Sequence, residues 1–421
     1  MNKEEKNENN NSINKNICNK IINNTNNIIN TQNFIQINYN NNQLPEFVLI
    51  NNNIYKNFSP HIINNQNSKL QISKQDILII NSLNNEIDVQ KNQINCHYLH
   101  HKIISNPNYS NEILFPFLFP NMISLINSPY GNLIYQSFIE ILNTKNLFIL
   151  LKTINNNFKE ISKSSNGTRV IQKLIEKSIK LNQNGNKIIQ KSLTEILKGK
   201  ITECCNDENA NHIIQKFIIN IPYPNNNFIF KEIYQNFMNI AITKYGCCVI
   251  QKCLLSGIKE QKDKIIFLVL QNTFNLIINQ FGNYVYQSVI LLNDDKVNIK
   301  IIEIIFNKII ILCKEKYSSN VIEKLFDIDN ISIKNQLIDY ITNSESKVME
   351  LLTNKYGNYI VQKMISICQD KNLFFRILSI IAKNVNTINK ISFGNKLIGK
   401  LTEKYPILNK MINSNNNEII F

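Results

Sequence analysis

A short segment that recurs with a nearly fixed period constrains this chain more than any other feature. Its copies include YGCCVIQKCL, FGNYVYQSVI, YSSNVIEKLF and YGNYIVQKMI. We call the residue that follows the YG pair, or its equivalent, position i. The copies place position i at Asn132, Thr168, Asn211, Cys247, Asn283, Ser319 and Asn358. The successive spacings of 36, 43, 36, 36, 36 and 39 residues indicate a repeat protein.

Two degenerate copies of the segment extend the series at its ends. A step of 36 residues back from Asn132 reaches Cys96 in INCHYLHHKI, and a step of 37 forward from Asn358 reaches Asn395 in SFGNKLIGKL. Eight repeats and a terminal cap therefore fill residues 80–412. The two long spacings contain the polar segments LNQNGNK, from 181, and NSESKV, from 343. We expect both segments to form surface loops between helices.

Helical patterns fill the repeats. Apolar residues recur at helical spacing, as a stripe of Ile266, Val269, Leu270, Phe274, Ile277 and Ile278. The chain has only 10 Gly and 9 Pro, which favours helices over turn-rich sheet. The two residues after i+1 are apolar and are predicted to be core, as in Val249 with Ile250, Val321 with Ile322, and Ile360 with Val361. A period in the thirties made only of helices predicts an all-α solenoid, in which each repeat buries its apolar face on its neighbours.

The N-terminal region differs in composition from the repeats. Residues 1–60 contain 22 asparagines and few large apolar residues. We predict a disordered Asn-rich arm over 1–79, a repeat domain over 80–412 and a tail over 413–421. The first ten residues, MNKEEKNENN, lack the apolar run of a secretory signal, and the apolar window from Ile113 is broken by Pro116 and Pro120. We therefore expect no membrane association.

Charge and cysteine usage restrict the partners and the compartment. The formal net charge of +15 favours a polyanion partner, nucleic acid before membrane, although lysine-rich coding would raise the charge of any protein. The nine cysteines are scattered and form no C-x-x-C pair, which favours a reducing compartment such as cytosol or nucleus.

Three positions stay polar or variable inside each otherwise apolar repeat helix: i, i+1 and i+4. We call them the triplet. Residues i and i+4 project from one face a turn apart, and i+1 lies beside them. Position i+4 holds Gln136, Gln172, Gln215, Gln251, Gln287, Glu323 and Gln362. Position i+1 holds Leu133, Arg169, His212, Cys248, Tyr284, Asn320 and Tyr359. Stacked repeats would align these positions in ladders along one surface.

The chemistry of the ladders matches single-stranded RNA. A flat base can stack on Tyr, His or a guanidinium while amides hold its Watson–Crick edge. An amide offers a donor and an acceptor, which match uracil. A carboxylate only accepts, whereas guanine presents two donors, its N1–H and its exocyclic amine. The single acid, Glu323, therefore predicts a guanine reader.

In these residues the sequence resembles the Pumilio (PUF) family of single-strand RNA-binding proteins, over about three quarters of the chain. The resemblance implies a right-handed, crescent-shaped α-solenoid in which each repeat contacts one base. It also implies RNA that runs antiparallel to the protein, edge reading by i and i+4, and stacking by i+1. Uracil readers are then Asn358 with Gln362, Asn283 with Gln287, and Asn132 with Gln136.

The resemblance assigns the remaining triplets as well. Ser319 with Glu323 would read guanine, and Asn320 lies between them. Cys247 with Gln251, and Thr168 with Gln172, resemble adenine readers, while Asn211 with Gln215 and His212 resembles the repeat that tolerates several bases. The implied target is UGUAnAU.

Some positions depart from the family pattern. Leu133 and Cys248 stand where a ring or Arg is usual, so their bases should be held less firmly. The first repeat has Cys96, His97 and His100 at the triplet positions and matches the family pattern weakly. Base reading and no base reading are both open for this repeat. The terminal copy has Gly399 in place of Gln, as expected for a cap.

Several plainer interpretations compete with these. Glu323 and Arg169 could be ordinary surface charges, and Cys96 with His100 could be taken for a zinc pair; we expect no metal and no cofactor. The sequence contains no nucleophile–base set and no phosphate-binding loop, so we expect no enzyme. The lysines after the i+4 position (Lys173, Lys216, Lys252 and Lys363) would contact either phosphates or solvent.

The resemblance leads to a functional expectation. It implies a cytoplasmic post-transcriptional regulator, monomeric on RNA, that binds mRNA 3′ untranslated regions and acts with corepressors or deadenylation machinery. The alternatives are a nucleolar PUF-related protein in ribosome biogenesis, with a nuclear or nucleolar location, and a helical protein–protein scaffold. Triplets that lack base-reading residues would favour the nucleolar alternative. Triplets without flat side chains would favour the scaffold.

Overall fold

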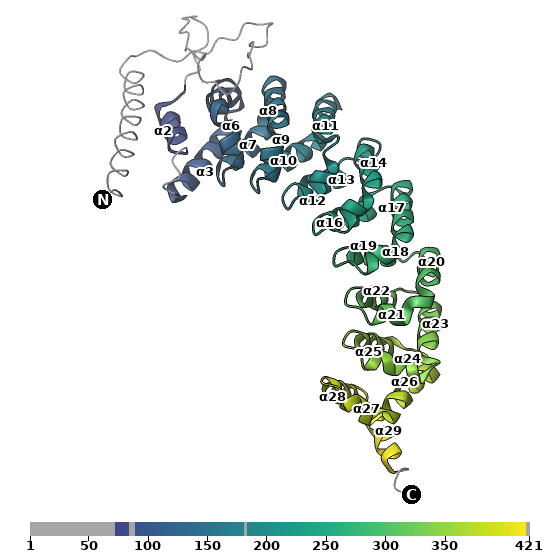
Figure 1. The fold of residues 1–421 in the computed structure, drawn as a ribbon. Helices are drawn as coiled ribbons and strands as arrows, with labels where there is room; N and C mark the ends of the chain where they lie inside the picture. The colour runs from purple at the N-terminus through teal and green to yellow at the C-terminus, as the bar shows by residue number, and fades with distance from the viewer. Residues whose placement is uncertain (1–71, 84–88, 181–182, 418–421) are drawn as a thin grey trace, which may run out of the picture. The chain divides into compact units, whose positions relative to one another are not determined.

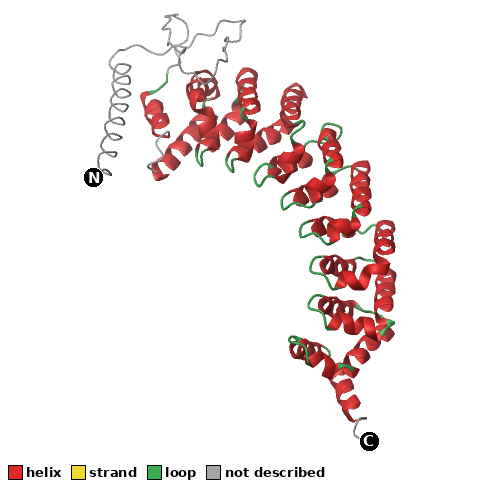
Figure 2. Ribbon diagram, in the orientation of Figure 1, coloured by secondary structure: helices red, strands yellow, loops and turns green. Residues whose placement is uncertain are grey.

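The computed structural model describes residues 72–83, 89–180 and 183–417, and the regular structure in these ranges is helical (Figure 1, Figure 2). The chain divides into two compact parts, which we call the N-terminal part (through Leu150) and the C-terminal part (from Leu151). The predicted arm over residues 1–79 lies outside the described residues except for its last eight positions.

The N-terminal part contains the first repeats. Its helices are α2 (Lys74–Leu83), α3 (Val89–Ser105), α4 (Pro107–Tyr109), the π-helical turn η2 (Ser110–Leu114), α5 (Phe115–Leu118), the 3₁₀ turn η3 (Phe119–Asn121), α6 (Met122–Asn127) and α7 (Gly131–Ile141). Helix α8 (Thr144–Asn156) runs across the boundary between the parts. Helices α3 and α7 pack against each other, and α6 packs on α7.

The C-terminal part repeats one pattern of a long helix, a short helix and a helix that carries the triplet. The long helices are α11 (Gln183–Leu197), α14 (Asn227–Gln235), α17 (Lys259–Gln271), α20 (Asp295–Ile305), α23 (Ile331–Thr342) and α26 (Lys371–Lys383). The short ones are α9 (Phe158–Lys163), α12 (Ile201–Asn206), α15 (Phe237–Ala241), α18 (Thr273–Ile277), α21 (Ile309–Cys313) after η4 (Phe306–Lys308), α24 (Glu345–Leu352) and α27 (Val385–Asn389). The triplet helices are α10 (Gly167–Lys180), α13 (Asn211–Asn220), α16 (Gly246–Ser256), α19 (Gly282–Ile290), α22 (Ser318–Leu325) and α25 (Gly357–Ile367), followed by α28 (Gly394–Lys404) and the closing helix α29 (Pro406–Asn417).

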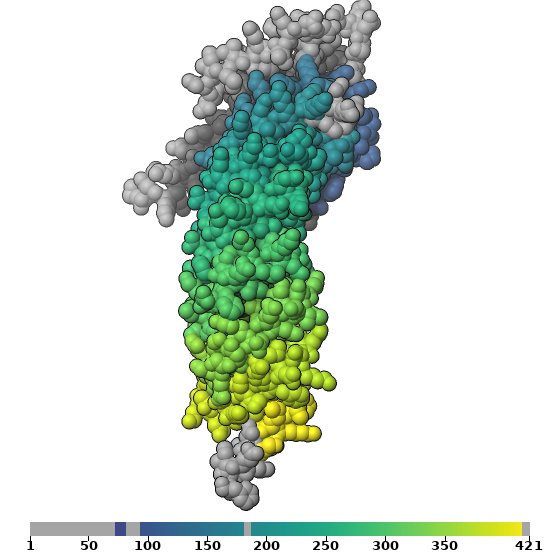
Figure 3. Space-filling view, turned by 90° about the vertical axis from the view of Figure 1, so that its right-hand side faces the viewer, coloured from purple at the N-terminus to yellow at the C-terminus, as the bar shows by residue number. Residues whose placement is uncertain are grey.

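Successive triplet helices form one row of this part. Helix α10 packs on α13, α13 on α16, α16 on α19, α19 on α22 and α22 on α25. The long helices form the opposite row, in which α14, α17, α20 and α23 follow one another (Figure 1). Figure 3 views that opposite side, where the repeats of the C-terminal part succeed one another in chain order. The all-helical repeat fold predicted from the sequence is confirmed.

The core lies between the rows. The apolar pair after position i+1 is buried as predicted, because Val249, Ile250, Val321, Ile322 and the matching pair of α25 are at most 1% exposed. Fully burying one such side chain stabilises the fold by about 1.5–3 kcal/mol. The pair therefore fixes the rotation of each triplet helix, and it directs position i+1 away from the core.

The apolar stripe from Ile266 to Ile278 does not follow a single helix. Helix α17 ends at Gln271 and α18 begins at Thr273, so the chain bends at Asn272. Asn272 has φ −110° and ψ 23°, and its side-chain amide donates to the Leu268 carbonyl at 2.8 Å. Asparagine tolerates this sparsely populated conformation and satisfies the last turn of the long helix. Ile278, beyond the bend, is 56% exposed and lies outside the core.

The same joint recurs between other long and short helices. The side-chain amide of an asparagine donates to the carbonyl four residues earlier at Asn157 (2.9 Å), Asn236 (3.1 Å) and Asn384 (2.9 Å). Each of these asparagines has φ between −118° and −109°. The bend therefore recurs along the chain. Asparagine forms it at these four joints, whereas Lys200 and Lys308 take a similar backbone conformation before α12 and α21.

The expected surface loops are largely helical. Residues 183–187 of the first polar segment belong to α11, and residues 345–348 of the second belong to α24, which leaves only 343–344 as a connection. The extra residues lengthen the helices: α24 has 8 residues, whereas the corresponding α18 has 5. The prediction of inserted loops was wrong because polar residues also occupy the exposed face of a helix. Helix α29 likewise continues to Asn417, past the expected end of the repeats at 412.

A buried aspartate attaches α2 to the first repeat. Asp76 is fully buried and accepts hydrogen bonds from Lys102 Nζ (2.6 Å), Tyr109 Oη (2.6 Å) and Ser73 Oγ (2.6 Å). Burial acts to raise the pKa of this carboxyl, but the bonds from Lys102, Ser73 and Tyr109 outweigh burial and hold the pKa below its usual value. Residue 80, the predicted start of the repeat domain, falls inside α2, so a fragment that begins there would lack both Ser73 and Asp76.

Changing Asp76 to Asn should loosen α2 and α3 locally. Removal of the charged acceptor should lower the free energy of local opening by about 1.5–3 kcal/mol. Because folding lowers the pKa of Asp76, its contribution is present above the unfolded value of about 4 and is lost as pH falls through the folded value. Amide hydrogen exchange in α3 should therefore be faster in the variant at neutral pH, and the difference should fade below about pH 4. Changing exposed Gln75 to Ala is the control, and equal exchange in all three proteins at neutral pH would contradict the prediction.

Candidate nucleic-acid interface

Four triplet helices (α7, α16, α19 and α25) start where the chain passes very close to the short helix before them. A Cβ on Gly357 would lie 2.9 Å from the Leu351 carbonyl oxygen, and one on Gly246 only 2.3 Å from that of Ile240. Glycine allows this approach because it has no side chain. In YSSNVIEKLF the place belongs to Ser318, whose buried Oγ donates to the Leu312 carbonyl at 2.6 Å. A short polar side chain therefore substitutes for glycine by bonding to the carbonyl that it meets.

All seven triplets have the same exposure pattern. The side chains at position i are buried, at 0–5% exposure, and those at i+4 are half-buried. Those at i+1 are exposed, including Leu133 at 39%, Tyr284 at 50% and Tyr359 at 57%. The buried members are Asn132, Thr168, Asn211, Cys247, Asn283, Ser319 and Asn358. The structure thus presents i+1 and i+4 on the surface, and it places position i beneath them.

Four triplets with Asn at position i share a hydrogen-bond relay. In α25 the Asn358 amide donates to the Asn354 carbonyl at 2.9 Å, and Asn358 Oδ1 accepts from Gln362 Nε2 at 2.9 Å. The corresponding Gln–Asn distances are 2.8 Å for Gln136, 2.8 Å for Gln215 and 2.9 Å for Gln287. A backbone carbonyl only accepts, so it fixes the asparagine amide, which in turn requires the glutamine to donate. The glutamine then offers Oε1 and its second N–H to a ligand.

The other three triplets lack this relay. Thr168 Oγ1, Cys247 Sγ and Ser319 Oγ each donate to the carbonyl three residues earlier, at 3.3 Å. Burial raises the pKa of the Cys247 thiol to about 12, so it remains a neutral thiol. These short side chains do not reach the i+4 residue. In these repeats the side chain at position i does not orient the side chain at i+4.

The predicted guanine reader lines a hollow of ≈ 220 Å³ with the stacking residue of the next repeat. Glu323 from α22 and Tyr359 and Gln362 from α25 border this space, together with residues of α28 such as Lys400. Glu323 is half-buried, and its carboxylate has no hydrogen-bond partner among the described residues. A base whose edge meets Glu323 can therefore lie against the ring of Tyr359. This neighbourhood joins the edge reader of one repeat to the flat side chain of the next.

The first repeat resembles the others at positions i and i+1 but differs at i+4. In α3 Cys96 is buried at 1% exposure, while His97 and His100 are exposed. His100 Nδ1 lies 2.5 Å from Ser137 Oγ of α7. In the terminal copy Gly399 is exposed and has nothing within 4 Å of an added Cβ, so α28 offers no reader there.

The position after each reader, i+5, was not recognised in the sequence as a structural position. Lys216 pairs with Glu176 of the preceding repeat at 2.6 Å, and Lys363 pairs with Asp327 at 2.5 Å. Lysine therefore links neighbouring repeats at these positions. Three other lysines, at i−3, lie over the tyrosine that follows them: Lys244, Lys316 and Lys355, at 5.0, 5.1 and 4.9 Å from the ring centroids. These lysines place positive charge beside the triplets.

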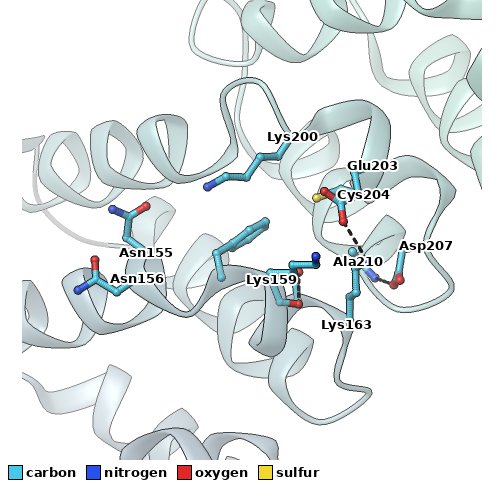
Figure 4. Close-up of a pocket in the computed structure, with 11 residues that line it drawn as sticks. Asn155, Asn156, Lys159, Lys163, Lys200, Glu203, Cys204, Asp207 and Ala210 are labelled. Atoms are coloured by element: carbon cyan, nitrogen blue, oxygen red, sulfur yellow. Dashed lines mark hydrogen bonds and ion pairs between the residues drawn. The ribbon is translucent and has the colours of Figure 1, made fainter. Parts of the chain in front are cut away.

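A second hollow of the C-terminal part contains none of the triplet residues. It has a volume of ≈ 270 Å³ and lies between α9 and α12 (Figure 4). Lys163 forms an ion pair with Glu203 at 2.8 Å on its wall, and Lys200 lies 4.9 Å from the centre of the Phe158 ring. Because no triplet residue borders this hollow, we assign it no role in base reading.

No group of three or more His, Cys, Asp or Glu side chains that could hold a metal ion occurs in residues 72–83, 89–180 and 183–417. Within the same ranges, no helix is both long and apolar enough to cross a membrane.

Comparisons with known proteins agree with the geometry. A family model described as a NOP9-like PUF repeat domain matches residues 105–396. The curated relatives include suppressor protein MPT5 of Saccharomyces cerevisiae, which is 30% identical over 184 residues (42% of this chain and 21% of the relative). Pumilio homolog 9 of Arabidopsis thaliana is 26% identical over 226 residues (53% of this chain and 37% of the relative). The chain thus spans about a fifth to a third of the length of these relatives.

Solved structures match over nearly their whole length. The Puf4 RNA binding domain bound to an HO endonuclease RNA 3′ UTR recognition sequence is 30% identical, covers 73% of this chain and 95% of its own, and has a TM-score of 0.66. Yeast Puf5p RNA-binding domain bound to SMX2 RNA is 26% identical, with 77% and 97% coverage and a TM-score of 0.61. The matched family model spans more than half of the chain. The chain therefore belongs to the PUF repeat family of RNA-binding proteins.

Proposed function

We propose that this chain is a sequence-specific single-stranded RNA-binding protein that recognises UGUAnAU-type elements in mRNA 3′ untranslated regions. The observation that carries the proposal is the triplet geometry. In each of seven helices a buried residue at i lies beneath a half-buried reader at i+4 and an exposed residue at i+1. A protein–protein scaffold has no need for this repeated pattern.

The hydrogen-bonding groups of each triplet support the base assignments. In the Asn–Gln repeats the glutamine offers one acceptor and one donor, which match the N3–H and a carbonyl of uracil. Glu323 offers acceptors only, which match the two donors of guanine. Cys247 and Thr168 are short, and they leave more room beside their glutamines for the larger purine ring of adenine. With RNA antiparallel to the protein, the helices from α25 back to α7 give UGUAnAU.

A regulatory role follows from this target. We propose that the protein acts in the cytoplasm on bound transcripts as a monomer, and that it recruits corepressors or deadenylation machinery. Support for an mRNA partner comes from the related Puf4 and Puf5p domains, whose structures hold RNA, in the Puf4 case a 3′ UTR recognition sequence. The repeat domain of residues 80–412 would supply RNA binding.

A nucleolar PUF-related protein in ribosome biogenesis is the second candidate. The match to a NOP9-like PUF model favours it. The seven complete triplets favour the first candidate, since a protein that does not select a short element has no need to preserve them. Selection of bound RNA from a random pool distinguishes the two: enrichment of UGUAnAU supports the first, and the absence of any enriched element supports the second.

Binding should prefer single-stranded RNA and should weaken strongly with salt. Stacking on Tyr284 and Tyr359 requires splayed bases, so a duplex of the same sequence should compete poorly. The net charge of +15 and the lysines beside the triplets imply release of counterions, so affinity should fall linearly on a logarithmic plot against salt. Competition of a labelled UGUAnAU RNA with single-stranded, duplex and DNA versions of the same sequence measures the preference for single-stranded RNA. Repeating the binding measurement at several salt concentrations measures the salt dependence. Equal affinity for duplex and single strand at physiological salt would refute the assignment of the site.

A further inference from the structure

The glutamines of the Asn–Gln repeats read a base selectively only while one orientation of the amide is held. The two ends of an amide differ in hydrogen-bonding sense, because the oxygen accepts and the nitrogen donates. Uracil presents its N3–H beside carbonyls, whereas cytosine presents a bare N3 beside an amine. A glutamine amide with its two ends exchanged would therefore match cytosine in place of uracil. The relay excludes that orientation, because it would set Gln362 Oε1 against Asn358 Oδ1.

The relay begins at position i−4, whose residue we call the turn residue. In α19 and α25 the turn residues are Asn279 and Asn354, whose backbone carbonyls accept from the side-chain amides of Asn283 at 2.8 Å and Asn358 at 2.9 Å. Each carbonyl also accepts from the backbone N–H of the same position-i residue, at 3.3 and 3.2 Å. Because a carbonyl only accepts, its direction decides which end of the position-i amide faces the glutamine.

The side chain of the turn residue holds that carbonyl in place. Asn354 Oδ1 accepts from the backbone N–H groups of Tyr356 at 2.8 Å and Gly357 at 2.9 Å. Asn279 makes the same two bonds in α19, at 2.8 and 2.9 Å. These bonds close a turn that fixes the peptide of the turn residue relative to the start of the triplet helix. Both asparagines are half-buried, so the turn is partly shielded from water.

The turn residues of other repeats show which of these turns serve a relay. Ser128 and Asp207 precede the other two Asn–Gln triplets, and each accepts from the backbone N–H at i−1, at 2.8 and 2.9 Å. Ser164 makes the same bond at 3.1 Å, but Thr168 donates to the next carbonyl along, that of Ser165. The turn at Ser164 therefore starts a helix without orienting a glutamine.

The repeat of Glu323 differs from all of these. Its turn residue, Glu315, is exposed, and the carboxylate of Glu315 has no hydrogen-bond partner among the described residues. The two oxygens of the Glu323 carboxylate are equivalent, so this reader has no orientation to be held. Among the seven described triplets, the turn bond is therefore missing only where the reader does not require it.

We propose that Asn279 and Asn354 are positioning residues for base reading. Each holds, through its side chain, the carbonyl that sets the hydrogen-bonding sense of the glutamine in its triplet, and so makes its repeat prefer uracil to cytosine. The inference rests on the function proposed above. With RNA antiparallel to the protein, Asn354 acts on the first base of UGUAnAU and Asn279 acts on the third.

The test replaces turn residues in the full chain. Asn354→Ala and Asn279→Ala remove the turn bonds, whereas Asn354→Ser and Asn279→Ser keep an acceptor of the kind that Ser128 provides. Ser164→Ala is the matched control, because it removes a turn bond at a half-buried site that has no relay. Each protein is titrated with RNAs that carry uracil or cytosine at the first or third base of the element, and adenine or guanine at the sixth.

We expect each alanine variant to lose discrimination at its own base only. The preference for uracil over cytosine should fall by about threefold to tenfold, the value of one hydrogen bond, and the serine variants should restore it. Ser164→Ala should lower the thermal midpoint of unfolding, as the asparagine variants do, but it should keep every base preference. A role in stability alone would move the midpoint and leave discrimination unchanged.

A gain-of-function variant measures the same effect without the loss of a native contact. In a protein with Ser319→Asn and Glu323→Gln, the further change Glu315→Asn should supply the missing turn bonds. The preference for uracil over cytosine at the second base should then rise by about threefold to tenfold. Equal discrimination with and without Glu315→Asn would count against the inference.

Nuclear magnetic resonance on glutamine-labelled protein reports the relay in the absence of RNA. Side-chain amide protons of Gln287 and Gln362 should exchange faster in the alanine variants than in the wild type. If the wild type prefers the element but the alanine variants keep its preference for uracil, or if the serine variants discriminate no better than the alanine variants, the inference is overturned. If the wild type binds the element no better than a scrambled RNA, the proposed function fails instead, and unchanged amide exchange in both alanine variants would overturn the inference as well.

Discussion

Changing Glu323 to Gln together with Ser319 to Asn should move the preference at the second base from guanine to uracil. The double variant copies the neighbouring repeats, in which an Asn at position i bonds to the carbonyl four residues earlier and orients its glutamine. Glu315, which precedes α22, supplies the carbonyl four residues before Ser319. The switch should amount to about 1–3 kcal/mol, or roughly 5-fold to 150-fold, the scale of a bidentate contact to a base edge.

The measurement is the affinity of both proteins for UGUAnAU and UUUAnAU RNA. The other bases should keep their preferences, because the hollow at Glu323 is bordered only by α22, α25 and α28 and the residue after α28. Glu315→Gln is the matched control, since it removes an exposed carboxylate next to the same helix. If wild type and double variant prefer the same oligomer, Glu323 is a surface acid and the base assignment fails.

Removal of both exposed tyrosine rings should weaken RNA binding more than any single edge change. Tyr284 and Tyr359 are 50% and 57% exposed, so alanine in their place removes little buried surface and should leave the fold intact. Each stacked base contributes about 1–3 kcal/mol, so the double variant should lose at least roughly 30-fold in affinity for UGUAnAU. Sequence preference should persist, because the edge readers remain.

Phe267→Ala provides the matched control for the ring removal. Phe267 is 49% exposed on α17, in the row opposite the triplets. Its removal should leave RNA affinity unchanged, while circular dichroism should show equal helix content in all three proteins. An equal loss of affinity in the control, or no loss in the tyrosine variant, would place the RNA on another surface.

The fold could be predicted from the sequence because every repeat has the same pattern of apolar and small residues. The apolar pair exemplified by Val249 and Ile250, the small residue before position i and the period of 36 are all consequences of helices that pack on near-identical neighbours. The triplet exposure also follows, since the buried pair fixes the rotation of the helix. Exposed Tyr284 and half-buried Gln287 lie where helical geometry requires.

The remaining features could not be predicted because they depend on contacts between residues far apart in sequence or on common residue types. Asn272 and its counterparts form the bends of the repeats, but asparagine is so abundant in this chain that no single one stood out. Ser137 and Ser288 differ from lysine at i+5, but the sequence does not show that they meet His100 and Gln251 of the preceding repeat. The buried Asp76 belongs to a helix that shows no trace of the repeat.

The contacts between successive triplet helices have a consequence for how errors spread along the C-terminal part. Helix α16 packs on α13 and α19, and the ion pairs at Lys216 and Lys363 reach back one repeat. Physical influence is therefore short-ranged, and a disturbance in one repeat decays within its immediate neighbours. In the proposed mode of binding, a substitution in one repeat can then change the preference for one base of the RNA target and leave the other preferences unchanged. Proteins built from such repeats can therefore diverge in their targets by single substitutions.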